Sequence, residues 1–342
     1  MDKKIILTFD YELFLKKSGT IEKCLIEPTQ KFIEQSKKFP IYGTFYVDVL
    51  FLLKIKHRYP LEYHKIRDQL KRLVDYGNRL ELHLHPSWKD AVEAQSKDTL
   101  QWNFPKFDFY SLKSFSSLEI QTMFLEGKCE LEEIAQEIKQ DYRLHSFRAG
   151  GWSITPFKAI KDAMIQSDIY VDSTVAPGLY RESDVQNYDF RESSRDKVYW
   201  TFSNNPAKAN EGKFTEWPIT TYKISIFGKI LRKIERKSEM NKRPDNFDIF
   251  GDGVGMSISD VGLRNGESVF HRILRPNMYT LQDVIPSELI RRIKNERRDW
   301  ITFISHPKKL SNNSFLAIQK LAENGCEFYT IKGALDALKD DQ

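Results

Sequence analysis

Short runs rich in Ile, Val and Phe alternate along the chain with longer segments of helical periodicity. This alternation is typical of βα units around a mostly parallel sheet. We expect strands at residues 4–9, 43–49, 79–85, 144–148, 169–172, 214–219, 300–305 and 327–330. Strands that alternate with helices in this number favour one distorted, TIM-like (β/α) barrel of about seven parallel strands over two separate domains.

The helical segments are expected between these strands. They fall near residue 28 and at 61–76, 117–140, 287–297 and 315–323, with a further helix at the C-terminal end. Gly77 can end the second helix, and Thr155 can cap another that has Pro156 at its first position. The sequence therefore predicts a single barrel domain over 1–342, interrupted by an inserted segment at 221–285.

Composition excludes several classes of protein. The chain has 342 residues, of which 40% are apolar, so it can bury a large core. Its net charge of +5 is too mild for a uniformly basic nucleic-acid binder, and it carries no P-loop or GxGxxG fingerprint. The three cysteines form no CxxC pair, and no run is apolar enough for a signal peptide or a spanning helix. We expect a cytoplasmic protein that binds no nucleic acid.

The positive charge is concentrated in one segment. Between Lys223 and Arg243 the chain has eight basic and two acidic side chains, a net +6 that leaves the remainder at −1. Apolar residues recur there at helical spacing, which predicts a basic amphipathic helix. Such a helix either packs on the barrel with a solvated basic face or lies on an anionic membrane at the inner face.

Polar residues fall where strands are predicted to end. In (β/α) barrels the reacting groups lie at the C-terminal ends of the strands, because the βα loops build that face. Here five predicted strands end at, or are directly followed by, ionisable residues: Asp10, His83 and His85, Arg148, Asp172 and His306.

Two of these strand ends predict a metal site. Asp10 and Glu12 are two residues apart, as are His83 and His85, and this spacing in an extended chain places each pair on one side. Two imidazoles and one carboxylate with an open fourth position are typical of catalytic zinc. We therefore expect a divalent metal ion, zinc in the first instance, on Glu12, His83 and His85.

The other strand ends suggest catalytic and binding roles. His306 can donate a proton across the barrel mouth, and Arg148 can hold a catalytic carboxylate ionised. Asp172 either orients one of these two residues or caps the turn that follows it. The candidate substrate-binding residues are Trp152, which follows two glycines, together with Trp88 and Tyr11.

The order of these motifs resembles a known family. Thr-Phe-Asp at 8–10, Gly-Thr-Phe-Tyr-Val at 43–47, the histidines at 83 and 85, Arg-Ala-Gly-Gly-Trp at 148–152, Tyr-Val-Asp-Ser at 170–173 and Ile-Ser-His at 304–306 look like the successive motifs of the NodB-homology polysaccharide deacetylases, carbohydrate esterase family four. The variants at 10–12, 83–86 and 148–152 look most like the WbmS-like branch, associated with bacterial O-antigen and surface-polysaccharide biosynthesis. The resemblance covers about 1–220 and 285–340.

The resemblance implies a metal-dependent removal of an N-acetyl or N-formyl group from a sugar. We expect the substrate to be a glycan, or a sugar linked to a nucleotide or a lipid. By motif, Asp10 would be the base acting on a metal-bound water, Arg148 would tether it, and His306 would be the general acid. Glu12, His83 and His85 would hold the metal. The family usually has a ligand aspartate directly after the base and histidines four apart, positions held here by Tyr11 and Ser87.

Two alternatives stand beside this interpretation. Relatives of such a barrel include hydrolases of cyclic amides such as allantoin. The departures at Tyr11 and Ser87 favour instead a degenerate barrel that binds a glycan without catalysis.

Overall fold

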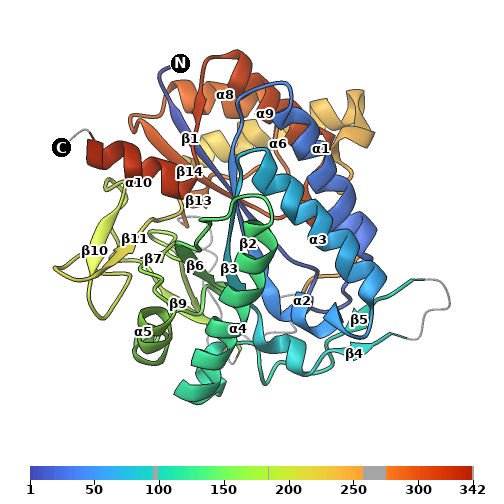
Figure 1. The fold of residues 1–342 in the computed structure, drawn as a ribbon. Helices are drawn as coiled ribbons and strands as arrows, with labels where there is room; N and C mark the ends of the chain where they lie inside the picture. Colours follow the sequence, from blue (N-terminus) through green and yellow to red (C-terminus); the bar gives the residue numbers. More distant parts are fainter. Residues whose placement is uncertain (95–98, 184, 257–274, 341–342) are drawn as a thin grey trace.

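Seven parallel strands form the centre of the molecule (Figure 1). The computed structural model describes residues 1–94, 99–183, 185–256 and 275–340. Among these residues seven parallel strands lie in the order β11-β7-β6-β3-β2-β1-β14, and a short eighth, β15 (Glu327–Phe328), pairs parallel with the start of β1. Their bounds are β1 Lys4–Tyr11, β2 Gly43–Asp48, β3 Arg79–Leu84, β6 Ser146–Ala149, β7 Val171–Asp172, β11 Phe214–Glu216 and β14 Trp300–Ser305. The six strands from β1 to β11 follow chain order across the sheet. β14 pairs with β1 on the side of β1 that is away from β2.

The curled sheet is joined across its gap by chain that is not a strand. After β11, the backbone N–H of Thr220 donates to the carbonyl of Thr302 on β14, at 3.0 Å. In return, the N–H of Thr302 donates to Thr220 Oγ1 at 2.8 Å, and Trp217 Nε1 donates to Thr302 Oγ1 at 2.9 Å. The two ends of the sheet therefore meet, and the predicted distorted (β/α) barrel with seven parallel strands is confirmed.

Helices cover the outside of the barrel (Figure 1). Their bounds are α1 Glu27–Ser36, α2 Val49–Lys56, α3 Pro60–Asp75, α4 Ser117–Gln136, α5 Phe157–Gln166, α6 Ile226–Lys242, α8 Pro286–Lys294, α9 Asn312–Glu323 and α10 Ile331–Asp340. Gly77 follows α3 with φ of +78°, as its predicted role at the helix end requires. The prediction for Pro156 was wrong by one position, because its backbone is extended and α5 begins at the next residue.

Short strands extend or flank the barrel. β10 (Trp200–Phe202) pairs antiparallel with β11, and β15 (Glu327–Phe328) pairs with the start of β1. Three small hairpin-like pairs join β4 (Val92–Glu93) with β5 (Trp102–Asn103), β8 (Tyr180–Glu182) with β9 (Asn187–Asp189), and β12 (Thr221–Tyr222) with β13 (Asn277–Met278). The last pair brackets most of the predicted insertion, of which 257–274 lies outside the described residues.

Alternation along β1 separates the helix-covered side of the strand from the barrel interior. Phe9 packs against Phe32 of α1, and the Tyr11 hydroxyl donates to Gln69 of α3. The even-numbered residues point the other way, so that Thr8 contacts Arg148 of β6 across the barrel. Near the opposite end of β1, Ile6 packs in an apolar cluster with Trp217 and Trp300. Polar groups are thus gathered at the C-terminal ends of the strands.

Candidate active site

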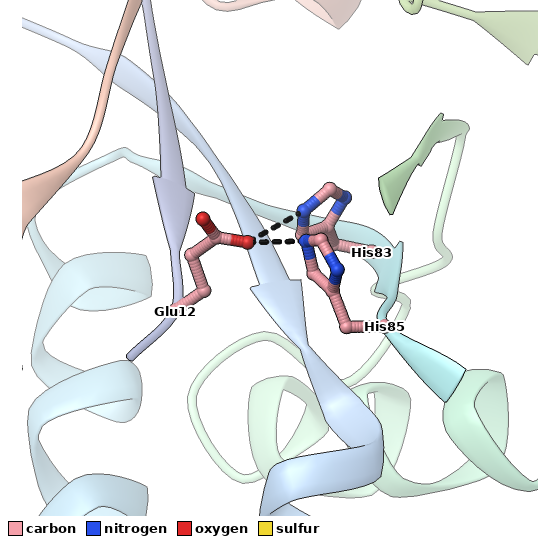
Figure 2. Close-up of side chains that lie close together, drawn as sticks. All are labelled: Glu12, His83 and His85. Atoms are coloured by element: carbon pink, nitrogen blue, oxygen red, sulfur yellow. Dashed lines mark hydrogen bonds and ion pairs between the residues drawn. The ribbon is translucent and has the colours of Figure 1, made fainter. Parts of the chain in front are cut away.

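Glu12, His83 and His85 come together at the end of β1 and the end of β3 (Figure 2). Glu12 Oε2 lies 3.1 Å from His83 Nε2 and 2.5 Å from His85 Nε2. All three side chains are buried. The two-residue spacing brings both imidazoles to one side because His83 is the last residue but one of β3 and His85, directly after the strand, keeps an extended conformation.

The backbone fixes which nitrogen of His83 faces Glu12. His83 Nδ1 donates to the carbonyl of Arg148 at 2.7 Å, because a carbonyl can only accept. In the neutral ring, Nε2 then holds its lone pair toward Glu12, which is the arrangement of a metal-ligating histidine. Burial lowers the pKa of His83, but the hydrogen bond that its protonated ring donates to Glu12 and the charge of Asp10 raise the pKa by more, so the net pKa is raised.

These three residues fit a divalent metal ion. Ligands about 2.0–2.1 Å from a tetrahedral zinc ion lie roughly 3.3 Å from one another. The Glu12–His83 separation of 3.1 Å matches that spacing, and the 2.5 Å separation from His85 requires the ring to move outward by less than roughly 1 Å. One carboxylate oxygen and two imidazole nitrogens are also the ligand types that zinc prefers.

Asp10 is held by a buried arginine. Arg148 Nη1 donates to Asp10 Oδ1 at 2.6 Å and to Thr8 Oγ1 at 2.9 Å, and the arginine side chain is fully buried. Its remaining nitrogens bond to Ser173, with Nε donating to the carbonyl at 2.7 Å and Nη2 to the hydroxyl at 3.0 Å. The guanidinium also stacks over the Tyr46 ring, 4.1 Å from its centroid. The predicted tether between Arg148 and Asp10 is therefore present in the geometry.

This ion pair decides the charge of Asp10. Burial on its own raises the pKa of the Asp10 carboxyl, but the charges of Arg148, His83 and His306 lower it further than burial raises it. Asp10 is thus ionised at neutral pH. Because Oδ1 is occupied by Arg148, Oδ2 is the oxygen left to accept a proton.

Lys308 is a site residue that sequence reasoning missed. Its side chain is only 4% exposed, and Nζ donates to Glu12 Oε1 at 2.8 Å and to the carbonyl of Leu13 at 2.6 Å. Burial raises the pKa of Glu12, yet Lys308, with His85 and His83, lowers it well below its usual value. Lys308 therefore holds one oxygen of Glu12 and leaves the other to the imidazoles. A Lys two residues after His306 was the one signal in the sequence.

His306 faces both carboxylates from the end of β14. Its Nε2 lies 3.6 Å from Asp10 Oδ2 and 3.4 Å from Glu12 Oε1. Gln282 Nε2 donates to His306 Nδ1 at 2.6 Å, which turns Nε2 toward the carboxylates. Burial lowers the pKa of His306 to about 4, against the opposing charges of Glu12 and Asp10.

A cavity of about 300 Å³ opens beside these groups. Five of the predicted site residues line it: Asp10, Glu12, His85, Trp152 and His306. Lining residues absent from the sequence prediction include Tyr110, Arg181, Gln186, Met256, Lys308 and Lys309. Met256 and its neighbour Gly255 come from the glycine-rich stretch Gly-Asp-Gly-Val-Gly-Met at 251–256.

The structure corrects two substrate-binding predictions. Tyr11 is an odd-numbered residue of β1, so its ring lies between the sheet and α3 and not in the cavity. Trp88 is buried in a short 3₁₀ turn, where Nε1 donates to Asp48 Oδ2 at 2.6 Å and the ring packs on Phe51 and Trp102. Neither side chain lines the cavity.

Asp172 does not bond to Arg148 or His306. It accepts hydrogen bonds from the backbone N–H and the hydroxyl of Thr174, which is the turn role that the sequence left open. Burial raises the pKa of Asp172 and, with the charge of Asp172, raises that of neighbouring Glu216 well above its usual value. Glu216 Oε2 has no hydrogen-bond partner among the described residues, and a negative charge on this buried oxygen would be unsatisfied.

Comparisons with known proteins give distant similarities. No family model and no curated protein matches the chain. Similar solved structures include a mutant, with restored enzymatic activity, of a carbohydrate esterase family four pseudoenzyme from Bacillus anthracis, at 11% identity over 96% of this chain and 66% of that chain, TM-score 0.41. A second is a putative polysaccharide deacetylase from Mycobacterium smegmatis, at 12% identity over 96% of this chain and 88% of that chain, with a TM-score of 0.45. A third is a 4-alpha-glucanotransferase from Thermococcus litoralis, at 11% identity over 98% of this chain and 40% of that chain, with a TM-score of 0.49.

The chain spans just under two thirds of the length of the pseudoenzyme and less than half of the glucanotransferase. The fold and the site define the class on their own: a distorted (β/α) barrel whose mouth holds a buried Glu-His-His cluster of metal-binding geometry.

Proposed function

We propose that this protein is a metal-dependent hydrolase that removes an N-acyl group, acetyl or formyl, from a sugar. The observation that carries the proposal is the convergence of Glu12, His83 and His85 beside a cavity lined also by Asp10 and His306. A set of metal ligands, an ionised carboxylate and an imidazole around one cavity are the groups that hydrolysis of an amide needs.

Each polar residue has a distinct task in this proposal. Glu12, His83 and His85 would hold the metal ion, which when bound supplies a Lewis acid for the acyl carbonyl and lowers the pKa of water. Asp10 accepts the proton of the attacking water at Oδ2, since Arg148 occupies Oδ1. General-base catalysis of this kind contributes about 10² to 10⁴ in rate.

His306 completes the proton transfer. Protonation of the departing nitrogen is needed because an amide anion is a poor leaving group. Because Gln282 donates to Nδ1, the neutral ring of His306 carries its proton on Nε2. His306 would give this proton to the departing nitrogen, while Asp10 Oδ2, 3.6 Å away, returns the proton taken from water to Nε2.

The remaining lining of the cavity suits a sugar. Trp152 and Tyr110 present rings on which the apolar face of a pyranose can stack, and Arg181 and Gln186 present hydrogen-bonding groups. Trp152 is positioned by Tyr188, whose ring lies edge-on with centroids 5.4 Å apart. We therefore favour a sugar over a cyclic amide as substrate.

We further propose that the sugar belongs to a bacterial surface polysaccharide and is presented on a nucleotide or a lipid carrier. The order of motifs shared with the WbmS-like branch supports this role. In the part of the chain that the structure describes, no helix is long and apolar enough to cross a membrane. A lipid-linked substrate would be met by a cytoplasmic enzyme at the inner face, through the basic segment 223–243.

Metal content and turnover, measured together, test the proposal. Purified protein, stripped of metal and then given zinc, is expected to bind one equivalent and to release acetate or formate from N-acylated sugars. His83→Ala is expected to lose both the metal and turnover. Asp10→Asn and His306→Gln are expected to keep the metal and lose turnover by at least about 100-fold. His57→Ala is the matched control, because His57 is exposed and lies outside the site.

The contrary outcomes are equally specific. A preparation that binds no metal from zinc, cobalt, nickel or manganese overturns the proposal. Ring opening of a cyclic ureide, without release of an acyl group from any sugar, identifies the cyclic-amide alternative.

One observation favours a second candidate, a glycan-binding barrel without catalysis. Lys308 already neutralises Glu12, as Arg148 neutralises Asp10, so the buried site is balanced in charge without a metal. That candidate predicts glycan binding by isothermal titration that is unchanged by chelator and by His83→Ala.

A further inference from the structure

Helix α6 exposes its apolar side to solvent. Five of the six large apolar side chains of the helix are exposed, at Ile226 63%, Phe227 70%, Ile230 51%, Leu231 43% and Ile234 60%, and the sixth, Met240, is half-buried. At about 100° per residue the five exposed side chains fall within an arc of roughly 140°. None of the residues of α6 is buried. A helix that packed on the barrel through its apolar side would show the opposite pattern.

The side of α6 that faces the barrel is polar. Arg236 Nε donates to Asp283 Oδ1 at 2.7 Å, and Arg232 Nη2 donates to the Asp283 carbonyl at 3.2 Å. Glu235 accepts from Arg291 of α8 at 2.8 Å. These three residues and the others on that side are half-buried, whereas the residues of the apolar arc are exposed. The helix is therefore held by ion pairs and hydrogen bonds with its apolar arc turned outward.

Lysines lie beside the apolar arc. Lys233 and Lys237 are exposed and, by helical geometry, lie along one edge of the arc. The segment 223–243 carries a net +6, while the rest of the chain carries −1. A second copy of the chain would meet this face with the same charge of +6, which opposes self-association. The outer face of α6 is instead complementary to a partner surface that is apolar inside and carries negative charge at its boundary.

We propose that the outer face of α6 docks on an anionic lipid bilayer. The helix would lie in the plane of the interface, with its apolar arc among the acyl chains and its lysines at the lipid phosphates. The barrel would then be held at the membrane by the ion pairs between α6 and the elements around Asp283 and Arg291. If the sugar substrate is lipid-linked, a step that rests on the proposed function, this docking brings the enzyme to the membrane that carries the substrate.

Sedimentation of the full chain with lipid vesicles tests the inference. Vesicles of phosphatidylcholine alone are compared with vesicles in which roughly one lipid in four is phosphatidylglycerol. Binding is expected to the anionic vesicles, and to weaken as salt is raised, because salt screens the contribution of the lysines.

Two pairs of substitutions separate the apolar and charged contributions. Phe227→Ser with Ile234→Ser is expected to lower the partition coefficient at least about tenfold. Lys233→Gln with Lys237→Gln is expected to lower it roughly 25-fold, at about fivefold for each charge. The matched controls are Leu61→Ser with Leu118→Ser and Lys38→Gln with Lys139→Gln, since all four residues are exposed on other helices or in the turns that follow them. Circular dichroism checks that each variant is folded.

Three results would overturn the inference. They are equal binding to neutral and anionic vesicles, equal losses in the α6 and control variants, and α6-dependent self-association without vesicle binding, which would make a second copy the occupant. Release of acyl groups from a soluble N-acylated sugar is measured in parallel. The α6 variants are expected to leave that turnover unchanged, so failure of docking and failure of the proposed hydrolase are told apart.

Discussion

Replacing Arg148 with Met tests whether the buried ion pair organises the site. The substitution keeps an apolar stem over the Tyr46 ring but removes the guanidinium that holds Asp10. Asp10 is 4% exposed, so without Arg148 its charge stays buried with no cation bonded to it. Water cannot solvate the carboxylate at that depth, and the native state alone bears the penalty.

The expected loss can be bounded from the geometry. Two unit charges about 4 Å apart attract by about 4 kcal/mol at an effective dielectric constant near 20. Breaking a buried pair by removal of one partner costs about 3–5 kcal/mol in measured cases. The hydrogen bonds from Arg148 to Thr8 and Ser173 disappear as well. We therefore expect Arg148→Met to lower the free energy of unfolding by about 3–5 kcal/mol.

Urea unfolding followed by circular dichroism measures this loss in a double-mutant cycle. Arg148→Met combined with Asp10→Asn is expected to be more stable than the sum of the single losses, because no unpaired charge remains buried. Arg58→Met is the control, since Arg58 is 69% exposed in its pair with Glu93 and its loss is expected to stay below about 1 kcal/mol. A loss below about 1 kcal/mol for Arg148→Met, or strict additivity in the cycle, would refute the reasoning.

Three further changes probe the surroundings of the site. Lys308→Met removes the cation that is bonded to Glu12. Compared with the wild type, we expect this variant to have a lower melting temperature without metal and a larger rise in melting temperature when zinc is added. An identical effect of zinc on the two proteins, measured by calorimetry, would contradict this. The pKa of Glu216 in the folded protein is raised well above its usual value, so the folded state holds a proton that the unfolded state loses, and the free energy of unfolding falls as pH rises from about 4.5. Glu216→Gln should remove this slope, of at most about 1.4 kcal/mol per pH unit, in urea unfolding between about pH 5 and 8. An unchanged slope would contradict this expectation. Gly150→Ala would place a Cβ against the Leu84 carbonyl oxygen and 2.8 Å from His85 Nδ1, so both the end of β3 and the His85 ring must shift. Zinc affinity should then fall by about tenfold or more in competition with a chelating dye, and unchanged affinity would show that His85 does not hold the ion.

Side chains of a strand alternate between its two sides, and this alternation explains both the correct prediction of the Glu-His-His cluster and the wrong prediction for Tyr11. The two-residue spacings placed Glu12 beside His83 and His85 as expected, because period-two geometry survives any tertiary context. The same rule places Tyr11 on the opposite side of β1, against α3, so the sequence already held the reason why it could not line the cavity.

Lys308 could not be predicted in this way. It lies in a short 3₁₀ turn after β14, where periodicity assigns no side, and a lysine followed by a second lysine is typical of an exposed loop. Its burial depends on Phe14 and on the carbonyl of Leu13, which come from the opposite end of the sequence. Local pattern carries no information on such a contact.

The charges of the buried site explain why its two carboxylates can play different roles. Each carboxylate gives one oxygen to a buried cation, Asp10 to Arg148 and Glu12 to Lys308. The second oxygen of Glu12 meets two imidazoles, whereas that of Asp10 lies nearer to His306. Two like charges in one cavity would otherwise push one carboxyl to stay protonated. With a cation behind each, both pKa values are lowered, so one carboxylate can serve as ligand while the other stays free as base.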